Sequence, residues 1–387
     1  MEQKKLCLSI NARNMDRISS LPDCILHQIL SFLETKNAVQ TSTLSKRWQN
    51  VFDTTSYFNF SYNFCEFADP LQLPAAAFNE LFDGHKDGFQ KCIFKVLHAQ
   101  NGYDCKKIII RCDLKLDSSF MSEVMEYAVK HKAQELEIMT FSDNQDSLKF
   151  PMSIYTCKTL EKLKLGGDQY DCIYVSKSMG FQFLKELRFY RLFFDTYYGF
   201  SEDIFSHCPC LELLSLVACC LDSSLESWVP SLKTFELIFP LSEKLSSRPS
   251  FIRIYAPLLS YIKYEGPDPM DFVLPDSASS LEEIDIDIQD DLSDKEDFRK
   301  KFFTERLIDM LRSFHNAKSV IISLNTLKIL SSMPSLLRGQ ESPFANLKNI
   351  QLKTSWSKLA PGWSFLLKNS PNVRALIQGD LNRVTRF

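Results

Sequence analysis

The sequence predicts a two-part α/β chain, in which a short helical head precedes a long solenoid built on a parallel β-sheet. Three observations support this prediction. Apolar residues gather at helical spacing within Met15–Phe52. A Leu-x-x-Leu-x-Leu motif recurs along most of the remaining chain. The length of 387 residues exceeds what one compact core of ordinary size holds, and suits two units or an extended array of repeats.

The head is predicted to contain three short helices. Ser20, with Asp23 three residues later and Pro22 in the first turn, marks a helix start. A second helical segment lies around Val39, and a third begins at Ser45. The first helix carries apolar side chains on more than one face, at Ile25, Leu26, Ile29, Leu30, Phe32 and Leu33. A unit of 38 residues cannot bury all of this surface by itself, so we expect part of it to contact another protein.

The segment that follows the head shows no repeat and is expected to be a packed junction between the head and the solenoid. It covers residues 53–104, with a helix expected across Ala75–Phe82 and a further apolar-periodic stretch at Phe89–Ala99. Gly84 and Gly88 lie between these two stretches.

The repeated motif begins at eleven positions. Clear copies such as Leu160-Glu-Lys-Leu163-Lys-Leu165 start at Leu160, Leu184, Leu211, Leu232, Leu281 and Leu347, and looser copies start at Cys105, Ala133, Leu259, Ala317 and Val373. From residue 105 to residue 373 the ten steps average 268/10, or about 27 residues, within the range typical of leucine-rich repeats. One such motif predicts little, because it occurs by chance in many helices. Eleven in series at a near-constant step predict a leucine-rich-repeat solenoid over residues 105–387.

Each motif is expected to form a short strand with one buried face, and neighbouring copies bury that face by stacking into a parallel, horseshoe-shaped sheet. The segments between strands return on the convex side, with helices expected at Ser122–Lys132 and Lys301–Phe314. Cys219 fills a position at which Asn or Cys caps backbone groups after a strand. The longest interval between copies contains the charged stretch Gln289–Lys301, which is expected to be an exposed loop or insertion.

Three clusters in the head resemble the F-box of plant F-box/leucine-rich-repeat proteins. The N-terminal cluster, or opening, is Leu21-Pro22-Asp23, and the middle cluster is Ile29-Leu30-Ser31-Phe32-Leu33. The C-terminal cluster, or close, is Leu44-Ser45-Lys46-Arg47-Trp48. The three occur in the order and at the spacing of that family. A small helical cap that only closes a larger fold would not need the opening and the close together. The resemblance implies an F-box that docks on the Skp-type adaptor of a cullin-based ubiquitin ligase. The adaptor-binding residues are then expected to be Leu21, Pro22, Ile25, Leu26, Ile29, Leu30, Phe32, Leu33, Val39, Leu44, Arg47 and Trp48.

The repeats resemble the same family, notably in Cys157-Lys-Thr-Leu160-Glu-Lys-Leu163-Lys-Leu165 and in Ser370-Pro371-Asn372-Val373. Many of these proteins carry a further C-terminal module of the FBD type. About ten residues follow the last motif, so this module is expected to be absent. The predicted organisation is a flexible tail at residues 1–14, the F-box at 15–52, the junction at 53–104 and a solenoid of about eleven repeats at 105–387.

The outward side chains of successive strands are expected to form a target-binding surface on the concave face. They mix charged residues with tyrosines, which suits protein recognition. Glu283, Asp285 and Asp287 alternate along one strand and would create a negative patch, which is either a solvated face or a site for a basic partner. The candidate residues are Lys162, Lys164, Arg188, Tyr190, Glu236, Tyr261, Lys263, Asp285, Asp287, Gln351 and Lys353.

Composition argues against several other classes of protein. The net charge of −3 is too small to indicate nucleic acid or an anionic membrane as a partner. Residues 1–14 lack the apolar run of a signal peptide, and no stretch reaches the roughly 18 apolar residues of a membrane span. Twelve cysteines without an export signal indicate reduced thiols and a location in the cytoplasm or nucleus.

The sequence contains no signature of a metal, a nucleotide or a catalytic site. It has no Cys-x-x-Cys pair, its six histidines are scattered, and its glycines form no phosphate-binding loop. A calcium loop that starts at Asp287 would need glycine where Leu292 stands. No cofactor is therefore expected, although a Cys–His pair assembled by the fold stays possible.

These features together favour a non-enzymatic substrate receptor of a Skp–cullin–F-box ubiquitin ligase. The expected partners are the Skp-type adaptor, through it a cullin, and an unknown target protein. Three alternatives stay open: a scaffold that binds the adaptor without causing degradation, a receptor that senses a small molecule, and a leucine-rich-repeat enzyme.

Overall fold

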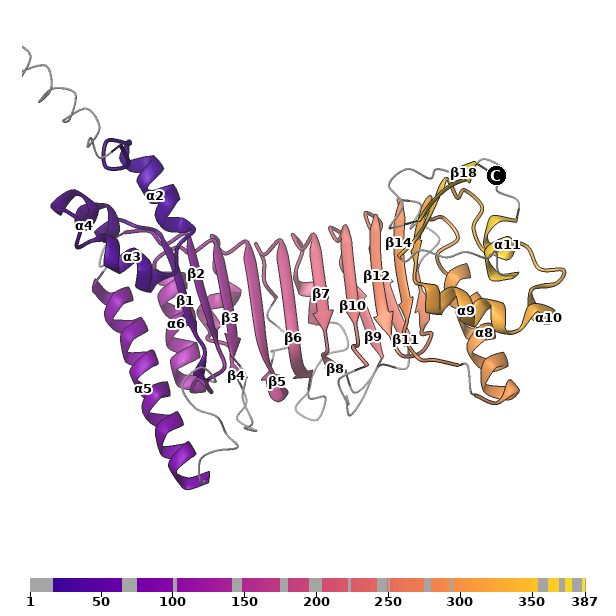
Figure 1. Ribbon diagram of the computed structural model, residues 1–387, viewed down its shortest axis with the longest axis horizontal. Helices are drawn as coiled ribbons and strands as arrows, with labels where there is room; N and C mark the ends of the chain where they lie inside the picture. The colour runs from indigo at the N-terminus through magenta and orange to yellow at the C-terminus, as the bar shows by residue number, and fades with distance from the viewer. Residues whose placement is uncertain are drawn as a thin grey trace, which may run out of the picture.

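The computed structural model describes residues 17–64, 75–99, 103–140, 148–174, 180–194, 204–221, 224–241, 249, 251–274, 280–292, 295–353, 361–368, 373–377 and 385–386. A helical head stands at one end of a long sheet, as Figure 1 shows. The predicted tail, residues 1–14, lies outside the described residues. No described helix is both long enough and apolar enough to cross a membrane.

The head contains the three predicted helices, α2 (Asp23–Ser31), α3 (Thr35–Thr41) and α4 (Lys46–Asp53). Ser45 caps α4 as predicted, because its hydroxyl accepts a hydrogen bond from the Trp48 amide at 3.3 Å. The prediction that Ser20 starts the first helix is wrong. Its hydroxyl donates to the Arg17 carbonyl, while Pro22 occupies the cap position and its carbonyl accepts the first helical bonds of α2.

Over the described residues the main sheet has 15 strands, and those along its path follow the order of the chain. All of its pairs are parallel except the last, between β17 and β18. Two short strands lie off the path: β4 (Leu148–Lys149) pairs with β5, and β8 (Cys220–Leu221) pairs with β6. Along the path the strands are β1 (Tyr57–Tyr62), β2 (Lys107–Cys112), β3 (Glu135–Thr140), β5 (Lys162–Tyr174), β6 (Glu186–Phe194), β7 (Leu213–Val217), β10 (Thr234–Ile238), β12 (Tyr261–Gly266), β14 (Glu283–Ile288), β15 (Ser319–Ile322), β16 (Asn349–Leu352), β17 (Arg374–Ile377) and β18 (Thr385–Arg386).

The positions of the repeated motif predict where these strands begin. Ten of the eleven predicted starts stand two residues before a strand of the sheet, and the eleventh, Val373, stands one residue before β17. Leucines of the motif, such as Leu160, Leu163 and Leu165, are buried in one continuous core. The predicted α/β solenoid with a parallel sheet is thereby confirmed.

The sheet begins earlier than the motif indicated. β1 lies inside the expected junction and pairs with β2. In this first copy Thr55, Phe58 and Phe60 take the places that Leu160, Leu163 and Leu165 take later, and all three are buried. The copy was missed because its first core position is the polar Thr55 and phenylalanine fills the other two.

The return segments contain helices and a second, smaller sheet. The helices are α5 (Ala75–Ala99), α6 (Ser118–Lys130), α7 (Met152–Tyr155), the short 3₁₀ helix η2 (Ile204–His207), α8 (Asp297–Arg312), α9 (Leu324–Ser332), α10 (Pro334–Leu337) and α11 (Pro361–Leu367). The smaller sheet has three strands that were not predicted, β9 (Leu225–Trp228), β11 (Phe251–Tyr255) and β13 (Asp271–Val273). Strands of three to five residues are too short for their alternation to stand out in the sequence.

Three predictions about the return segments need correction. The two predicted helices near Ser122 and Lys301 exist as α6 and α8, but each begins four residues earlier than expected. The stretches on either side of Gly84 and Gly88 form one continuous helix, α5. Gln289–Lys301 is not simply an exposed loop, since Leu292 in it is buried and α8 begins at Asp297.

Cys219 acts as predicted. Its thiol is fully buried and donates to the carbonyl oxygens of Phe189, at 3.5 Å, and Val217, at 3.6 Å. Burial raises the pKa of this thiol to about 12, so it stays protonated and able to donate at neutral pH.

Candidate functional site

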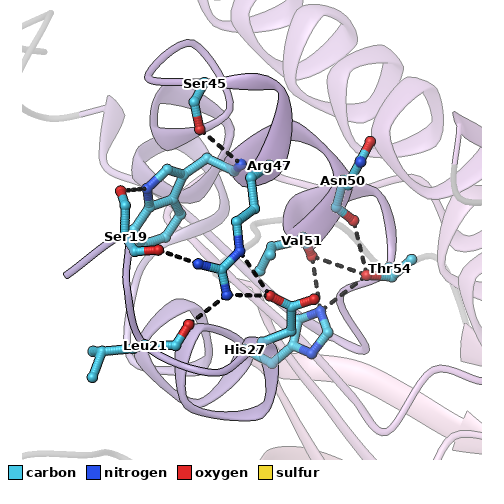
Figure 2. A network of polar contacts seen from close by, with 10 residues as sticks. Ser19, Leu21, His27, Ser45, Arg47, Asn50, Val51 and Thr54 are labelled. Atoms are coloured by element: carbon cyan, nitrogen blue, oxygen red, sulfur yellow. Dashed lines mark hydrogen bonds and ion pairs between the residues drawn. The ribbon is translucent and has the colours of Figure 1, made fainter. Parts of the chain in front are cut away.

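A hydrogen-bond network around Arg47 holds the head together (Figure 2). The Arg47 guanidinium donates to the backbone carbonyls of Ser19 and Leu21. It also donates to the Asp23 carboxylate, with nitrogen–oxygen distances of 3.1 and 2.6 Å. Because the planar guanidinium presents several donors in a fixed fork, lysine could not reproduce this set of bonds. Arg47 therefore fixes the start of α4 against the chain that enters α2.

Trp48 and His27 extend this network (Figure 2). The Trp48 indole N–H donates to the Ser19 hydroxyl at 2.8 Å, and its ring is buried. His27 Nε2 lies 3.0 Å from both the Val51 carbonyl oxygen and the Thr54 hydroxyl. These contacts fasten both ends of α4, one to the entry of α2 and the other to α2 itself.

The structure divides the twelve predicted adaptor-binding residues into three groups. Leu26, Leu30 and Trp48 are buried with Ala38 and Val51 in the core of the head, so their side chains are not available to a partner. Leu21, Ile29, Leu33 and Arg47 are partly buried. The side chains exposed to solvent are Pro22, Ile25, Phe32, Val39 and Leu44.

The exposed apolar residues on and beside α2 follow one helical stripe. Pro22, Ile25 and Phe32 lie on this stripe with the partly buried Ile29, at steps of three or four residues, whereas Leu26 and Leu30 lie on the core side. Phe32 is 79% exposed, and Leu44 in the turn before α4 is 68% exposed. Large apolar side chains with this exposure mark a surface that another protein can cover. We call Pro22, Ile25, Phe32, Val39 and Leu44 the docking surface.

Ile18 belongs beside this set but was missed in the sequence. Its side chain is 56% exposed, just ahead of α2. Helical spacing could not indicate it, because it precedes the first helix.

The predicted target-binding residues lie on the open face of the main sheet. This face is formed by the alternate strand side chains that point away from the core, and the pairing register aligns them across neighbouring strands. Lys164 faces Arg188 across β5 and β6, and Lys263 faces Asp285 across β12 and β14. The expectation that these residues share one face is consistent with this register.

Charges on the open face near the head are paired with one another. In the first row Glu135 accepts from Lys107 at 2.8 Å and from Lys162 at 3.2 Å. In the next row Glu137 lies between Arg111, at 2.8 Å, and Lys164, at 3.1 Å. Burial alone would raise the pKa of the Glu137 carboxyl, but hydrogen bonds and charges from these two cations hold it below its usual value.

Arg188 joins two strands of the open face, β6 and β10, that are not direct neighbours. Its guanidinium binds Glu186 on its own strand at 2.6 Å and Glu236 at 3.0 Å. Glu236 lies two strands away, beyond β7, where Ser215 is fully buried. The small serine side chain leaves room for arginine to cross over this strand.

The far part of the open face is more acidic. Asp285 was expected to point into solvent, but it is only 7% exposed and pairs with Lys353 at 2.6 Å. Glu283 accepts a hydrogen bond from the Ser319 hydroxyl, and Asp287 has no ion pair among the described residues. Burial, and then the carboxylates of Asp285, Glu236 and Glu283, raise the pKa of Tyr261 to about 12.

Comparison with protein-family models identifies both parts of the chain. The model for the F-box domain matches residues 18–60, which cover the docking surface and the network around Arg47. The chain carries an F-box. A second model, described as "FBD-associated F-box protein At5g56370, LRR repeats", matches residues 121–262. The F-box match extends to residue 60, within β1.

The chain is similar to F-box proteins of Arabidopsis thaliana, some of which are also named for leucine-rich repeats. F-box/FBD/LRR-repeat protein At1g78750 is 29% identical over 96% of this chain and 78% of its own length. FBD-associated F-box protein At4g13985 is 28% identical over 94% of this chain and 76% of its own length. F-box/FBD/LRR-repeat protein At2g26030 is 29% identical over 94% of this chain and 79% of its own length. The predicted resemblance to plant F-box/leucine-rich-repeat proteins is confirmed.

The described residues of the F-box and of the open face show no metal-binding arrangement. Within the part of the chain that the structure describes, no three His, Cys, Asp or Glu side chains are grouped so that they could hold a metal ion. In the F-box, Arg47 and Trp48 bind other residues of the head, and large apolar side chains such as Phe32 and Leu44 are exposed. The arrangement of the F-box is suited to protein contact.

Proposed function

We propose that this F-box/leucine-rich-repeat chain is the substrate receptor of a Skp–cullin–F-box ubiquitin ligase. The observation that carries the proposal is the docking surface: a matched F-box keeps its own small core buried and exposes the apolar residues of this surface, with Ile18 beside them. Proteins that combine an F-box with such repeats are generally non-catalytic adaptors. In this proposal the F-box binds the Skp-type adaptor and, through it, a cullin.

The solenoid would hold the target. The open face of the sheet extends away from the F-box along the whole array of strands (Figure 1). A target held there would have its lysines near a ubiquitin-charged enzyme, and proximity of this kind requires no reactive group from the receptor. The proposal places the protein in the cytoplasm or nucleus, where its cysteines stay reduced.

Co-purification with a Skp-type adaptor tests this proposal. The double substitution Phe32→Ala and Leu44→Ala removes two large, strongly exposed members of the docking surface without touching the buried core. We expect adaptor binding to fall by about tenfold or more, because each truncation of a central interface side chain costs about 1–2 kcal/mol.

Leu258→Ala is the matched control. Leu258 is 53% exposed but lies in the solenoid, between β11 and β12, and its truncation should leave adaptor binding unchanged. Equal adaptor binding by the wild-type chain and the Phe32/Leu44 variant, with both folded, would contradict the assignment.

A further inference from the structure

Among the described strands, β1 forms one edge of the main sheet. On one side β1 pairs with β2, and the carbonyls of Ser56 and Tyr62 accept bonds from that side. In a parallel strand the N–H and C=O of one residue point the same way, and successive residues alternate. Asn59 and Ser61 therefore direct their backbone groups to the other edge.

Contacts in the structure agree with this direction. The Asn59 N–H donates to the Thr35 hydroxyl of α3 at 2.8 Å, on the side away from β2. Ser61 is exposed, and no described residue bonds to its N–H or C=O. An unpaired N–H and C=O on an edge strand form a template for a further strand.

A groove of about 970 Å³ runs along this edge. It is lined by the five consecutive residues 59–63, whose side chains alternate between the two faces of the sheet. A hollow that touches all five must therefore follow the edge of the strand. Figure 1 shows α3, β1 and α5 together at this end of the sheet. The helical walls are formed by Thr35, Val39, Gln40, Gly88, Cys92 and Val96.

The α5 wall leaves space for an occupant. Gly84 and Gly88 line the groove, and a Cβ atom added at either one would meet nothing within 4 Å. Glycine inside a helix lowers its stability. No contact inside the described chain requires glycine at these positions, whereas an occupant of the groove would benefit from the free space.

We propose that an extended segment of the Skp-type adaptor adds to β1 as a further strand, in the groove between α3 and α5. This inference rests on the proposed function. An extended backbone is the partner that supplies both a donor and an acceptor to an edge strand.

Two features favour the adaptor as the occupant. Val39 lines the groove and also belongs to the docking surface, so a partner on that surface is continuous with the groove. A stable protein interface takes about 20–30 residues a side, more than the exposed apolar residues of the F-box provide. The charged side chains along the lining, Glu34 and Lys36, have opposite signs, so the inserted segment is expected to be uncharged.

Ser61→Pro tests the pairing. Proline removes the N–H that faces the groove and leaves the bonds between β1 and β2 intact, since proline is tolerated where the strand N–H points away from the ladder. Ser61→Ala is the control, because it removes the hydroxyl but keeps the N–H. With the full-length chain and purified adaptor, we expect Ser61→Pro to weaken binding about tenfold and Ser61→Ala to leave it unchanged.

Alkylation of Cys92 in the wild-type chain gives a second measurement that does not depend on the folding of a variant. Cys92 is exposed in the groove, and Cys210, exposed in the solenoid, is the internal control. Bound adaptor should slow iodoacetamide labelling at Cys92 and not at Cys210. If Ser61→Pro does not fold, the labelling rate of Cys92 in the wild-type chain is sufficient to test the strand pairing.

The outcomes separate the two proposals. Failure of the wild-type chain to bind the adaptor refutes the proposed function and, with it, this inference. If the wild-type chain binds, equal affinity of the two Ser61 variants or an unchanged labelling rate at Cys92 overturns the strand pairing alone. Protection of Cys92 by a second copy of this chain, without adaptor, would also overturn it.

Discussion

Arg47 shows how a residue of the F-box can matter to binding without contacting the partner. Its guanidinium is partly buried and binds two backbone carbonyls and the Asp23 carboxylate. The Asp23 side chain is 63% exposed, so the ion pair itself adds little stability. The bonds to the carbonyls of Ser19 and Leu21 matter more, because they set the path on which Pro22 and Ile25 are displayed.

Arg47→Ala should loosen the F-box. We expect the local free energy of opening of α2 to fall by about 1–2 kcal/mol, because charge-assisted hydrogen bonds to the backbone are lost. Amide hydrogen exchange over residues 23–31 measures this. Lys46→Ala is the control, since Lys46 is exposed on the same helix and has no ion pair among the described residues. Identical exchange rates in the two variants would refute the structural role of Arg47.

Glu137 should make stability depend on pH. Its pKa is lowered in the folded chain despite burial, because Arg111 and Lys164 bind the carboxylate. A carboxyl with a lower pKa in the folded state stabilises the fold above its unfolded value of about 4.3, and that stabilisation is lost as pH falls through the folded pKa.

Glu137→Gln should therefore lower the free energy of unfolding at pH 7 by about 1–2 kcal/mol, and by progressively less as pH falls below about 4. Urea denaturation at pH 7, 4 and 3 measures the difference. Glu123→Gln, at an exposed site on α6, should have little effect at any of these pH values. A cost that grows towards low pH would contradict the pairing.

At the scale of elements, the sequence predicts the positions of strands better than it predicts which side chains are exposed. The motif gives the strand positions because an apolar side chain, such as Leu163, Leu187 or Ile284, is buried at the same position of the copies, and burial leaves a fixed spacing. The first copy escaped detection because Thr55 and two phenylalanines serve the same purpose there. The three short strands of the second sheet carry no comparable repeat.

The F-box was predicted as a unit but not residue by residue. Ile25 and Leu26 are neighbours of similar character in the sequence, yet one is 39% exposed and the other is fully buried. The direction in which α2 faces depends on its packing against α4, through Trp48 and Val51, and spacing alone does not fix this. Arg47 was predicted as a contact residue because a lone arginine gives no sign of its bonds within the chain.

The continuity of α5 leads to a stability prediction. Gly84 sits inside this helix of 25 residues, where an alanine Cβ would meet no atom within 4 Å. Gly84→Ala should raise stability by about 0.5–1 kcal/mol, because alanine loses less conformational entropy in a helix. Gly180→Ala should have the opposite effect, since its Cβ would overlap the His207 backbone. Thermal unfolding of both variants measures this, and a destabilised Gly84→Ala would contradict a continuous α5.

At the scale of the whole molecule, the F-box and the solenoid have separate cores. The F-box core contains five buried side chains, whereas the solenoid core runs through the whole array. The Thr35–Asn59 hydrogen bond joins them where α3 meets β1. This separation lets variants of the docking surface be made without disturbing the open face, and variants of the open face without disturbing the F-box.

The central claim is that one chain connects an adaptor to a target that is then degraded. Protein turnover tests it most directly, in cells that express either the wild-type chain or the Phe32/Leu44 double-alanine variant. Proteins bound by both chains are identified by mass spectrometry, and their half-lives are compared. We predict that at least one shared binding partner has a shorter half-life with the wild-type chain, and that proteasome inhibition removes the difference. Equal half-lives for every shared partner, while the wild-type chain still binds the adaptor, would contradict the account and indicate a scaffold.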